Sequence, residues 1–284
     1  MGISRLELTG GDPLLLDRNL ILAAVEEGAD AGMHVALLTN GQHLTREYAE
    51  ALKAAGLGRM ETSLYGASGD VHDWFTGCSG SYGRTLDGIE AARGARLPLV
   101  VSTVVTRRNL EDVLSLPELL QPLGVDGIQL SCPVPSGRSR RSMQPHLLTE
   151  QEMTDAIEAV EAAFDPIPYL FLNSLFPEPQ LTLERYCHYF VEKLVVDHRG
   201  DIIPCCLMPG ELRQVLGNIT SDALSHICSQ TNAAQKPVFA WLSKGHEAMR
   251  EALAYRRRSH NLCVLCIEML SKLCAPAADP GDAR

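Results

Sequence analysis

Hydrophobic and polar positions change their period repeatedly along the chain up to about residue 164. Short apolar runs predict β-strands at Ile3–Thr9, His34–Thr39, Met60–Tyr65, Leu99–Thr106 and Gly127–Cys132. Longer segments with helical periodicity lie between and after them, at Arg18–Ala31, Thr45–Ala55, Tyr82–Arg93, Leu110–Leu120 and near Glu150–Phe164. Strands that alternate with helices predict βαβ units and an α/β fold with a parallel sheet.

Polar residues alternate with apolar ones inside several of these strands. A doubly wound sheet buries both faces and reads as continuous apolar runs, so this alternation favours a barrel with a polar interior. We therefore expect an open or partial (β/α) barrel, incomplete and TIM-like, in which six side chains point inside: Glu7, Thr9, Glu61, Ser63, Gln129 and Ser131. The functional site of such a barrel lies at the carboxyl ends of its strands.

The pattern changes after the last of these helices. Residues 165–186 carry four prolines within DPIPYLFLNSLFPEPQ and predict a linker. The next apolar runs, in KLVVDHRGDIIPCC, predict a β-hairpin, and helices follow near Ser221–Gln230 and His246–Arg257. We thus expect a partial barrel over 1–164, a small cysteine-ligated α+β domain over 187–274 and a disordered tail over 275–284.

Composition excludes several classes of protein. The formal net charge of −10 disfavours sequence-independent binding to nucleic acid, whose phosphates an acidic surface repels. Basic clusters at 138–141 and 256–258 are interpreted as solvated segments; a patch that grips a phosphate or an acidic peptide is the alternative. No apolar run is long enough to span a membrane, and the first residues do not form a signal peptide, which together indicate a cytoplasmic protein.

Small or polar residues stand at all five predicted strand ends. Gly10 and Gly11 follow the first strand, where they allow a ligand to approach the main chain closely. The later ends read TNG at 39–41, SLYG at 63–66, TVVTRRN at 103–109 and CP at 132–133, followed by GR at 137–138. Packing alone does not account for this series, so we expect a ligand site at the mouth of the barrel.

The ordered series of strand ends resembles the radical S-adenosylmethionine (SAM) enzymes. LELTGGDP is similar to their Gly-Gly-Glu-Pro motif, which contacts the amino group of SAM, with Asp12 in place of the usual Glu. SLYGASGDVHDWFTGCSGSYGRTLDGI resembles a stretch of the peptide-modifying members. The resemblance implies that Gly10, Gly11 and Asp12 hold the amino group and that Ser63 approaches the ribose. It also implies that Thr103 and the main chain near Leu130 line the nucleoside pocket.

One family feature is missing from this sequence. Radical SAM enzymes hold their catalytic [4Fe–4S] cluster with a Cys-x3-Cys-x2-Cys loop, and no such spacing occurs among these 284 residues. We expect a strand, the cluster loop and a helix to precede Met1 in a longer protein; a degenerate relative is the alternative. The chain by itself is then expected not to cleave SAM.

Seven of the nine cysteines lie after residue 186, which suggests thiolate ligation of a metal or cluster. Thiolates select iron–sulfur clusters or zinc. The order Cys, Gly-x4-Cys and Cys-x2-Cys resembles the SPASM or Twitch extension of radical SAM enzymes, which holds an auxiliary [4Fe–4S] cluster. That resemblance implies four ligands, Cys187, Cys205, Cys263 and Cys266. Cys206 competes with Cys205, the role of Cys274 stays open, and a structural zinc site is the alternative to the cluster.

The resemblance implies an enzyme that generates a 5′-deoxyadenosyl radical and modifies a substrate, for which we expect a ribosomally made peptide. Porphyrin-type substrates and a non-catalytic binding module with a zinc or Fe–S site are the alternatives. A flavodoxin or ferredoxin is the expected reductant. No residue is singled out as catalytic, because His72 and Asp73 are interpreted as an exposed helix-start or loop pair rather than as an acid–base pair.

Overall fold

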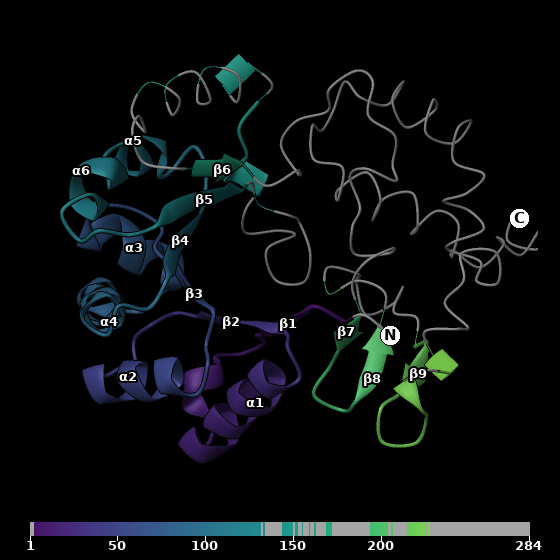
Figure 1. Ribbon diagram of the computed structural model, residues 1–284. Helices are drawn as coiled ribbons and strands as arrows, with labels where there is room; N and C mark the ends of the chain where they lie inside the picture. Colours follow the sequence, from purple (N-terminus) through teal and green to yellow (C-terminus); the bar gives the residue numbers. More distant parts are fainter. Residues whose placement is uncertain are drawn as a thin grey trace, which may run out of the picture. The chain divides into compact units, whose positions relative to one another are not determined.

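The computed structural model describes residues 3–131, 133, 144–149, 151–152, 155, 159, 162, 169–171, 194–203, 206, 215–224 and 226–227 (Figure 1). The chain divides into two compact units, one of residues 1–133 with 146–172 and one of residues 134–145 with 173–284. The division falls near residue 172, whereas the sequence predicts a linker that begins at 165. The apolar segment Tyr169–Phe171 explains the difference, because it forms a strand of the first unit.

The first unit is built on a six-stranded parallel sheet in which spatial order follows chain order. Its strands are β1 (Arg5–Leu8), β2 (His34–Thr39), β3 (Arg59–Ser63), β4 (Leu99–Val104), β5 (Gly127–Ser131) and β6 (Tyr169–Phe171). All five predicted strands are confirmed, and β6 is added. The sheet does not close, since β1 and β6 are its edges among the described residues, which agrees with the predicted partial barrel.

Helices of this unit cover one face of the sheet (Figure 1). They are η1 (Pro13–Leu15), α1 (Arg18–Asp30), α2 (Arg46–Ala54), α3 (Gly69–Thr76), α4 (Ser81–Gly94), α5 (Leu110–Leu114) and α6 (Leu116–Leu120); the short η2 (Gln144–His146) follows β5 in the chain. The prediction of one helix over Leu110–Leu120 is wrong: Pro117 lies in the first turn of α6, which starts a new helix there. Thr45 caps α2 by accepting from the Tyr48 N–H at 3.2 Å.

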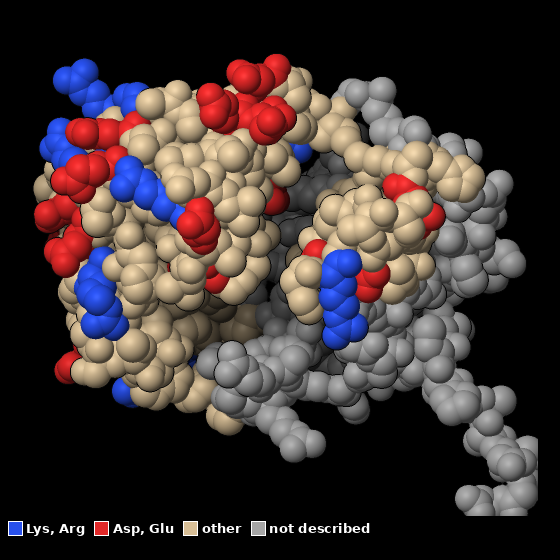
Figure 2. Space-filling view, turned by 90° about the horizontal axis from the view of Figure 1, so that it is seen from below, with Lys and Arg blue, Asp and Glu red and all other residues tan. Residues whose placement is uncertain are grey.

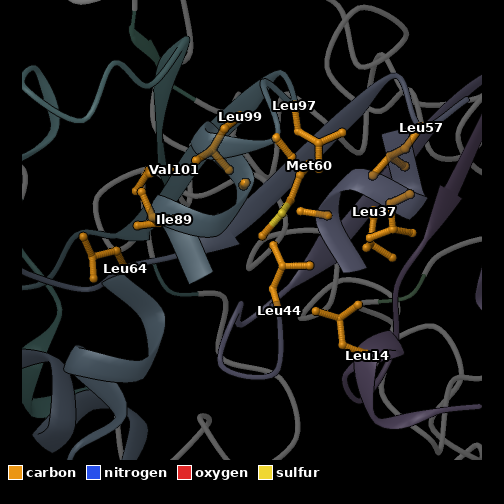
Figure 3. Packing of buried hydrophobic residues seen from close by; sticks show 14 of the residues in the cluster. Leu14, Leu37, Leu44, Leu57, Met60, Leu64, Ile89, Leu97, Leu99 and Val101 are labelled. Carbon is orange, nitrogen blue, oxygen red and sulfur yellow. The ribbon is translucent and has the colours of Figure 1, made fainter. Parts of the chain in front are cut away.

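The hydrophobic core lies between these helices and the sheet. Leu37, Met60 and Leu99 come from three neighbouring strands and are fully buried, and Leu97 and Ile89 pack into the same cluster (Figure 3). Apolar residues that point to this core alternate with polar ones along several of the strands, as the sequence predicts. Burial of this one face leaves the opposite face for polar side chains.

The polar residues predicted to point inside lie together on the face opposite the core. The register pairs Ser63 with Ser102 and Ser102 with Gln129, while Glu61 stands two residues before Ser63 on the same side of β3. Glu7 and Ser131 belong to this face by the same pairing, and Thr9 lies just beyond the end of β1. The orientation that alternation predicts is therefore confirmed for the five residues within strands.

The described part of the second unit is a small antiparallel sheet of β7 (Val195–Val196), β8 (Asp201–Ile203) and β9 (Gly217–Asn218). The predicted hairpin is β7 and β8, joined by a turn in which Gly200 has a φ of 80°. Ile202 is buried against Leu216 and Ile227, which form a separate small cluster. The hairpin thus has a core of its own.

Acidic and basic side chains are interspersed on the face of the molecule that Figure 2 shows. On the described part of this face, the Lys and Arg side chains do not gather into one basic patch. Within the described ranges, no helix has the length and apolarity that crossing a bilayer demands.

Candidate functional site

The loop after β1 presents bare main chain at the carboxyl edge of the sheet. Gly10 has a φ of 137°, a conformation that L side chains rarely adopt. A Cβ atom added at Gly10 or at Gly11 would meet no described atom within 4 Å, so space is open around both residues. This loop can therefore bring peptide groups into direct contact with a ligand.

The Asp12 carboxylate faces the protein rather than this space. Its Oδ1 accepts hydrogen bonds from the Leu14 N–H at 2.9 Å and from the Thr39 hydroxyl at 2.8 Å. Its Oδ2 accepts from the Asn40 N–H at 2.9 Å, and the residue is 9% exposed. Asp12 thus joins the ends of β1 and β2, and what it offers a ligand is its main chain.

Asn40, at the end of β2, has both main-chain groups bonded to buried side chains. Asp12 accepts from its N–H, and the Thr85 hydroxyl of α4 donates to its carbonyl at 3.0 Å. Helix α4 reaches this loop because residue 88 is glycine: a Cβ there would collide with the Gly41 carbonyl oxygen. The end of β2 is consequently held by the loop before it and by the helix beside it.

Tyr65, just beyond β3, shows the same arrangement. Its N–H donates to His72 Nδ1 at 3.2 Å, and its carbonyl accepts from Asn109 Nδ2 at 2.8 Å. Its ring stacks on Phe75 with centroids 4.3 Å apart. These contacts fix the strand end that carries Ser63.

The interpretation of His72 and Asp73 as an exposed pair is wrong for His72, which is 1% exposed and lies on α3, a helix that the sequence analysis missed. Burial lowers the pKa of His72, against a weaker opposing effect of Asp73, so the ring is neutral and accepts at Nδ1. Asp73 accepts from the Tyr82 and Gly80 N–H groups and the Ser81 hydroxyl, which lower its pKa and hold the start of α4. Both residues are structural supports.

Asn109 links the ends of β3 and β4 with all its hydrogen-bonding capacity. The buried amide accepts at Oδ1 from the N–H and the hydroxyl of Thr106, both at 2.7 Å. Its Nδ2 donates to the carbonyls of Tyr65 at 2.8 Å and of Val104 at 2.9 Å. An amide satisfied on both sides fixes one orientation of the side chain and so one geometry of the two loops.

A polar layer lies on the open face of the sheet below Ser63. Gln129 Nε2 donates to Glu61 Oε1 at 2.9 Å and to Ser102 Oγ at 3.4 Å, while Arg59 Nη2 lies 3.5 Å from Glu61 Oε2. Burial raises the pKa of Glu61, and the negative charge of Glu7 raises it further. The positive charge of Arg59 and the hydrogen bonds with Ser102 and Gln129 lower this pKa, but they do not cancel the effect of burial. The layer therefore holds a carboxyl group that keeps its proton more readily than a solvated one.

The side chains of Thr103 and Leu130, which are both connected with the predicted nucleoside pocket, lie on the core side of the sheet. Thr103 and Leu130 are paired in register and fully buried, and Leu130 belongs to the core between sheet and helices. Thr103 Oγ1 has no hydrogen-bond partner in the part of the chain that the structure describes. Only the main chain of these residues can contribute to a ligand on the open face, where Ser102 and Gln129 supply side chains.

The four predicted metal ligands, Cys187, Cys205, Cys263 and Cys266, lie outside the described residues, as do Cys132 and Cys274. Cys78 and Cys206 are described; both are exposed, and neither belongs to a disulfide. Across the described ranges, no group of three or more His, Cys, Asp or Glu side chains is arranged to hold a metal ion. The first unit thus provides the candidate ligand site and no described metal centre.

Sequence reasoning missed the residues that support the site rather than those that line it. Thr85, His72 and Asn109 are each buried and bond the main chain of a strand end. Thr106 with Asn109, three residues apart after an apolar run, carried a usable signal, because Asn side chains commonly bond nearby main chain at such turns. Thr85 and His72 gave none, since their partners lie 45 and 7 residues away on other segments.

Comparison with known proteins agrees with this geometry. Residues 1–120 match the Radical SAM superfamily, and residues 187–267 match SPASM, an iron–sulfur cluster-binding domain. Among curated proteins, the chain is 42% identical over 135 residues to the AdoMet-dependent heme synthase of Methanosarcina barkeri, covering 48% of this chain and 38% of the synthase. It is 28% identical over 178 residues to the PqqA peptide cyclase of Ruegeria pomeroyi, covering 59% and 47%. The chain thus spans less than half the length of either relative.

Solved structures share the fold at low sequence identity. Native anSMEcpe with bound AdoMet superimposes with a TM-score of 0.64 at 15% identity, over 84% of this chain and 70% of that one. Streptococcus suis SuiB bound to the precursor peptide SuiA gives 0.64 at 15% identity, over 82% and 54%. These structures show the fold alone; by the sequence matches, residues 1–120 of the chain are a radical SAM domain and residues 187–267 are a SPASM iron–sulfur cluster-binding domain.

Proposed function

We propose that this chain is the SAM-binding and auxiliary-cluster part of a radical SAM enzyme that modifies a peptide. The observation that carries the proposal is the open main chain of Gly10 and Gly11, set beside strand ends that buried side chains hold in place. A ligand with an ammonium and a carboxylate, such as SAM, needs fixed main-chain donors and acceptors without side-chain cover. The superfamily match of residues 1–120 supports the same assignment.

In this proposal Gly10, Gly11 and the Asp12 main chain hold the amino group of SAM, and Ser63 approaches the ribose. Thr103 and Leu130 contribute main chain to the nucleoside pocket. The residues present fit the group, because a cradle without Cβ atoms stands at the carboxyl edge of the sheet. When bound with a reduced [4Fe–4S] cluster, SAM supplies a 5′-deoxyadenosyl radical that abstracts a hydrogen atom from the substrate.

The protein's contribution is to position and to enclose. His72 and Asn109 keep the Tyr65 peptide group fixed, so that Ser63 stays at one place relative to the Gly10–Gly11 loop. Glu61 and Gln129 give the open face a hydrogen-bonded polar floor, on which Glu61 can hold a proton. Both oxygens of Glu61 have described partners, which hold the floor in one arrangement beneath a ligand.

The second part of the proposal concerns the SPASM region. Cys187, Cys205, Cys263 and Cys266 would supply four thiolates to an auxiliary [4Fe–4S] cluster, and thiolate donors are the ligands such clusters require. The match of residues 187–267 to an iron–sulfur cluster-binding domain supports this choice over zinc. A flavodoxin or ferredoxin would supply electrons to the complete enzyme.

The proposed substrate is a peptide, which the PqqA peptide cyclase relatives support by name. A tetrapyrrole is the second candidate, favoured by the 42% identity to the AdoMet-dependent heme synthase over 135 residues. The two differ in what must enter the barrel: an extended main chain or a flat macrocycle with carboxylate side chains. Turnover of either by the complete enzyme would decide between them.

A binding experiment on the anaerobically reconstituted chain tests the proposal. We expect SAM binding by isothermal titration calorimetry, with Gly11→Ala about tenfold weaker because the methyl group enters the ligand's space. Gly83→Ala is the matched control, since a Cβ at Gly83 also meets no described atom within 4 Å. Absence of SAM binding, or equal affinity of the two variants, would contradict the proposed cradle.

Iron and sulfide analysis tests the cluster. We expect about four iron and about four sulfide ions per chain, lost when Cys263 and Cys266 are replaced by serine. One zinc ion and no sulfide would instead support the non-catalytic binding module. The chain with its auxiliary cluster alone is expected not to cleave SAM reductively, because it contains no Cys-x3-Cys-x2-Cys; release of 5′-deoxyadenosine would overturn that expectation.

A further inference from the structure

Three side chains from the segments that follow β3, β4 and β5 meet beyond the carboxyl ends of these strands. Trp74 lies on α3 after β3, Arg108 follows β4, and His146 follows β5. Arg108 Cζ stands 5.3 Å from the centroid of the Trp74 ring, and the His146 ring packs edge-on to it with centroids 5.0 Å apart. We propose that these three residues form a subsite for a carboxylate side chain of the substrate peptide, an inference that rests on the proposed function.

Arg108 is the part of this subsite that offers hydrogen bonds. It forms no hydrogen bond or ion pair within the described ranges, and its one described partner is the indole face. Its neighbour Arg107 differs, because Nε and Nη2 donate to the two oxygens of Glu152 at 2.8 and 2.6 Å. One arginine therefore holds the structure together, and the other presents a planar fork that matches a carboxylate.

Two carboxylates close to these residues in sequence do not neutralise Arg108. Asp73 accepts three hydrogen bonds at the start of α4, and Asp112 accepts from the Ser68 N–H at 2.9 Å. Both are thus engaged by the main chain or hydroxyl groups of their own surroundings. The exposed Asp70 and Glu111 lie as near in sequence and also form no ion pair with Arg108 within the described ranges. A carboxylate from outside therefore finds a cation without an ion-pair partner there, which favours an acidic ligand.

Trp74 supplies a rigid apolar wall. The indole is 40% exposed, and exposed tryptophan and arginine side chains are typical of positions that dominate binding energies. Phe75 packs edge-on to the indole and stacks on Tyr65, which ties the wall to the end of β3. His146 is fixed from the other side, since its carbonyl accepts from the Arg107 N–H at 2.9 Å. The ring contacts thus limit the side-chain freedom that Trp74 would lose on binding.

The location suits a peptide whose reactive residue enters the barrel. Ser63 lies at the end of β3, two residues before Tyr65. The Tyr65 ring stacks on Phe75, and Phe75 in turn packs against Trp74. A peptide gripped at this subsite by an acidic side chain would place a neighbouring residue over the open face of the sheet. The subsite would therefore select peptides by an acidic residue near the modified position.

Trp74 itself can report binding. The sequence holds two tryptophans, Trp74 and Trp241, so Trp241→Phe leaves Trp74 as the single reporter in the full chain. The probe is a capped hexapeptide of alternating glycine and glutamate, with the glutamine peptide of the same length and free acetate as comparison ligands. We expect a saturable change in fluorescence with the glutamate peptide and at least about tenfold weaker binding of the glutamine peptide.

Variants connect the signal to the subsite. Arg108→Gln is expected to weaken the glutamate peptide about tenfold or more, and Arg108→Lys to weaken it less, because the charge stays while the fork is lost. Arg18→Gln is the matched control: Arg18 lies 4.8 Å from the Tyr48 ring, a cation–π contact of the same kind on α1 and α2. It should leave the affinity unchanged.

The inference would be overturned if the glutamate peptide gave no saturable response or if the glutamine peptide bound with equal affinity. It would also be overturned if the Arg108→Gln variant bound the glutamate peptide as well as the parent does. Acetate that reproduces the full effect would also overturn it, since it would indicate a small-anion site rather than a peptide subsite. SAM affinity and iron content are measured on the same samples. Normal values for both would separate failure of this subsite from failure of the proposed function.

Discussion

The hydroxyl of Thr39 donates a 2.8 Å hydrogen bond to Asp12 Oδ1, across 27 residues of sequence. The bond joins the ends of two neighbouring strands, and the same carboxylate accepts from the N–H groups of Leu14 and Asn40. All three partners of this buried carboxylate are hydrogen-bond donors. An amide N–H₂ group in place of either carboxylate oxygen would therefore face a donor and form no hydrogen bond with it. The geometry of the Gly10–Gly11 loop therefore depends on the Asp12 carboxylate, whose oxygens are bonded to protein groups rather than facing the open space beside the glycines.

Asp12→Asn is expected to lower the free energy of unfolding by about 2 kcal/mol, because the new amide N–H₂ must face one of three donors. Urea unfolding at pH 7 measures the change. Asp17→Asn is the control, since Asp17 caps α1 by accepting from Asn19 and Leu20, and asparagine caps equally well. Equal effects of the two substitutions would contradict the role assigned to Asp12.

Asn109→Asp should destabilise the protein by about 3 kcal/mol, since a carboxylate oxygen would face the carbonyls of Tyr65 and Val104. SAM affinity should fall as well, because the Tyr65 strand end carries Ser63. Thermal unfolding and calorimetry measure the two effects. Asn19→Asp, at an exposed position in the first turn of α1, should change neither; a stable Asn109→Asp variant with normal affinity would refute the linkage.

Glu61→Gln should alter the pH dependence of stability. Burial raises the pKa of Glu61, so the folded state keeps a proton that the unfolded state releases as pH rises above its ordinary value of 4.5. In this window the wild-type protein loses stability that the glutamine variant retains. The variant's advantage in the free energy of unfolding should therefore be smallest near pH 4 and grow with pH until the folded pKa is passed.

Glu50→Gln is the control for that experiment. Glu50 is exposed and pairs with Arg46 on one helix face at 3.0 Å, which contributes no more than about 0.5 kcal/mol. Its substitution should change the free energy of unfolding by no more than that amount at any pH between 4 and 8. A difference for Glu61→Gln that does not change with pH would show that the carboxyl is not perturbed.

His72→Asn should flatten the loss of stability on acidification. Burial lowers the pKa of His72 below its ordinary value of 6.5, so the unfolded state takes up a proton first as pH falls. Stability from neutral His72 is complete above that ordinary pKa and is lost as pH falls toward the folded one. Asparagine keeps an acceptor for the Tyr65 N–H and does not titrate. His43→Asn, at an exposed position, is the control.

The period of the apolar residues was sufficient to predict five of the six strands of the sheet, and β6 was missed. His34–Thr39 was predicted at its observed bounds, and the inward orientation of Glu61 and Gln129 followed from alternation alone. Helix α3 was missed because Gly69–Thr76 has only eight residues, and contacts of His72 and Phe75 with other segments hold it. Its tertiary contacts were not visible in the local sequence.

The candidate site was predicted less completely than the fold. Gly10 and Gly11 were recognisable, since paired glycines after a strand have a local meaning. Thr103 was expected at the nucleoside pocket, yet its side chain lies on the core face of β4, one residue out of phase with Ser102. A one-residue offset reverses the face of a strand, and a motif resemblance alone does not settle it.

The close approach of α4 to the Gly41 carbonyl has a consequence for how this sequence can diverge. Substitutions on the outer surface of the helix are free to accumulate, whereas any side chain at position 88 would push the helix away from the β2 end and carry Thr85 off the Asn40 carbonyl. A substitution of Gly88 during evolution would then lower the affinity for the cofactor, although Gly88 itself does not contact the proposed ligand.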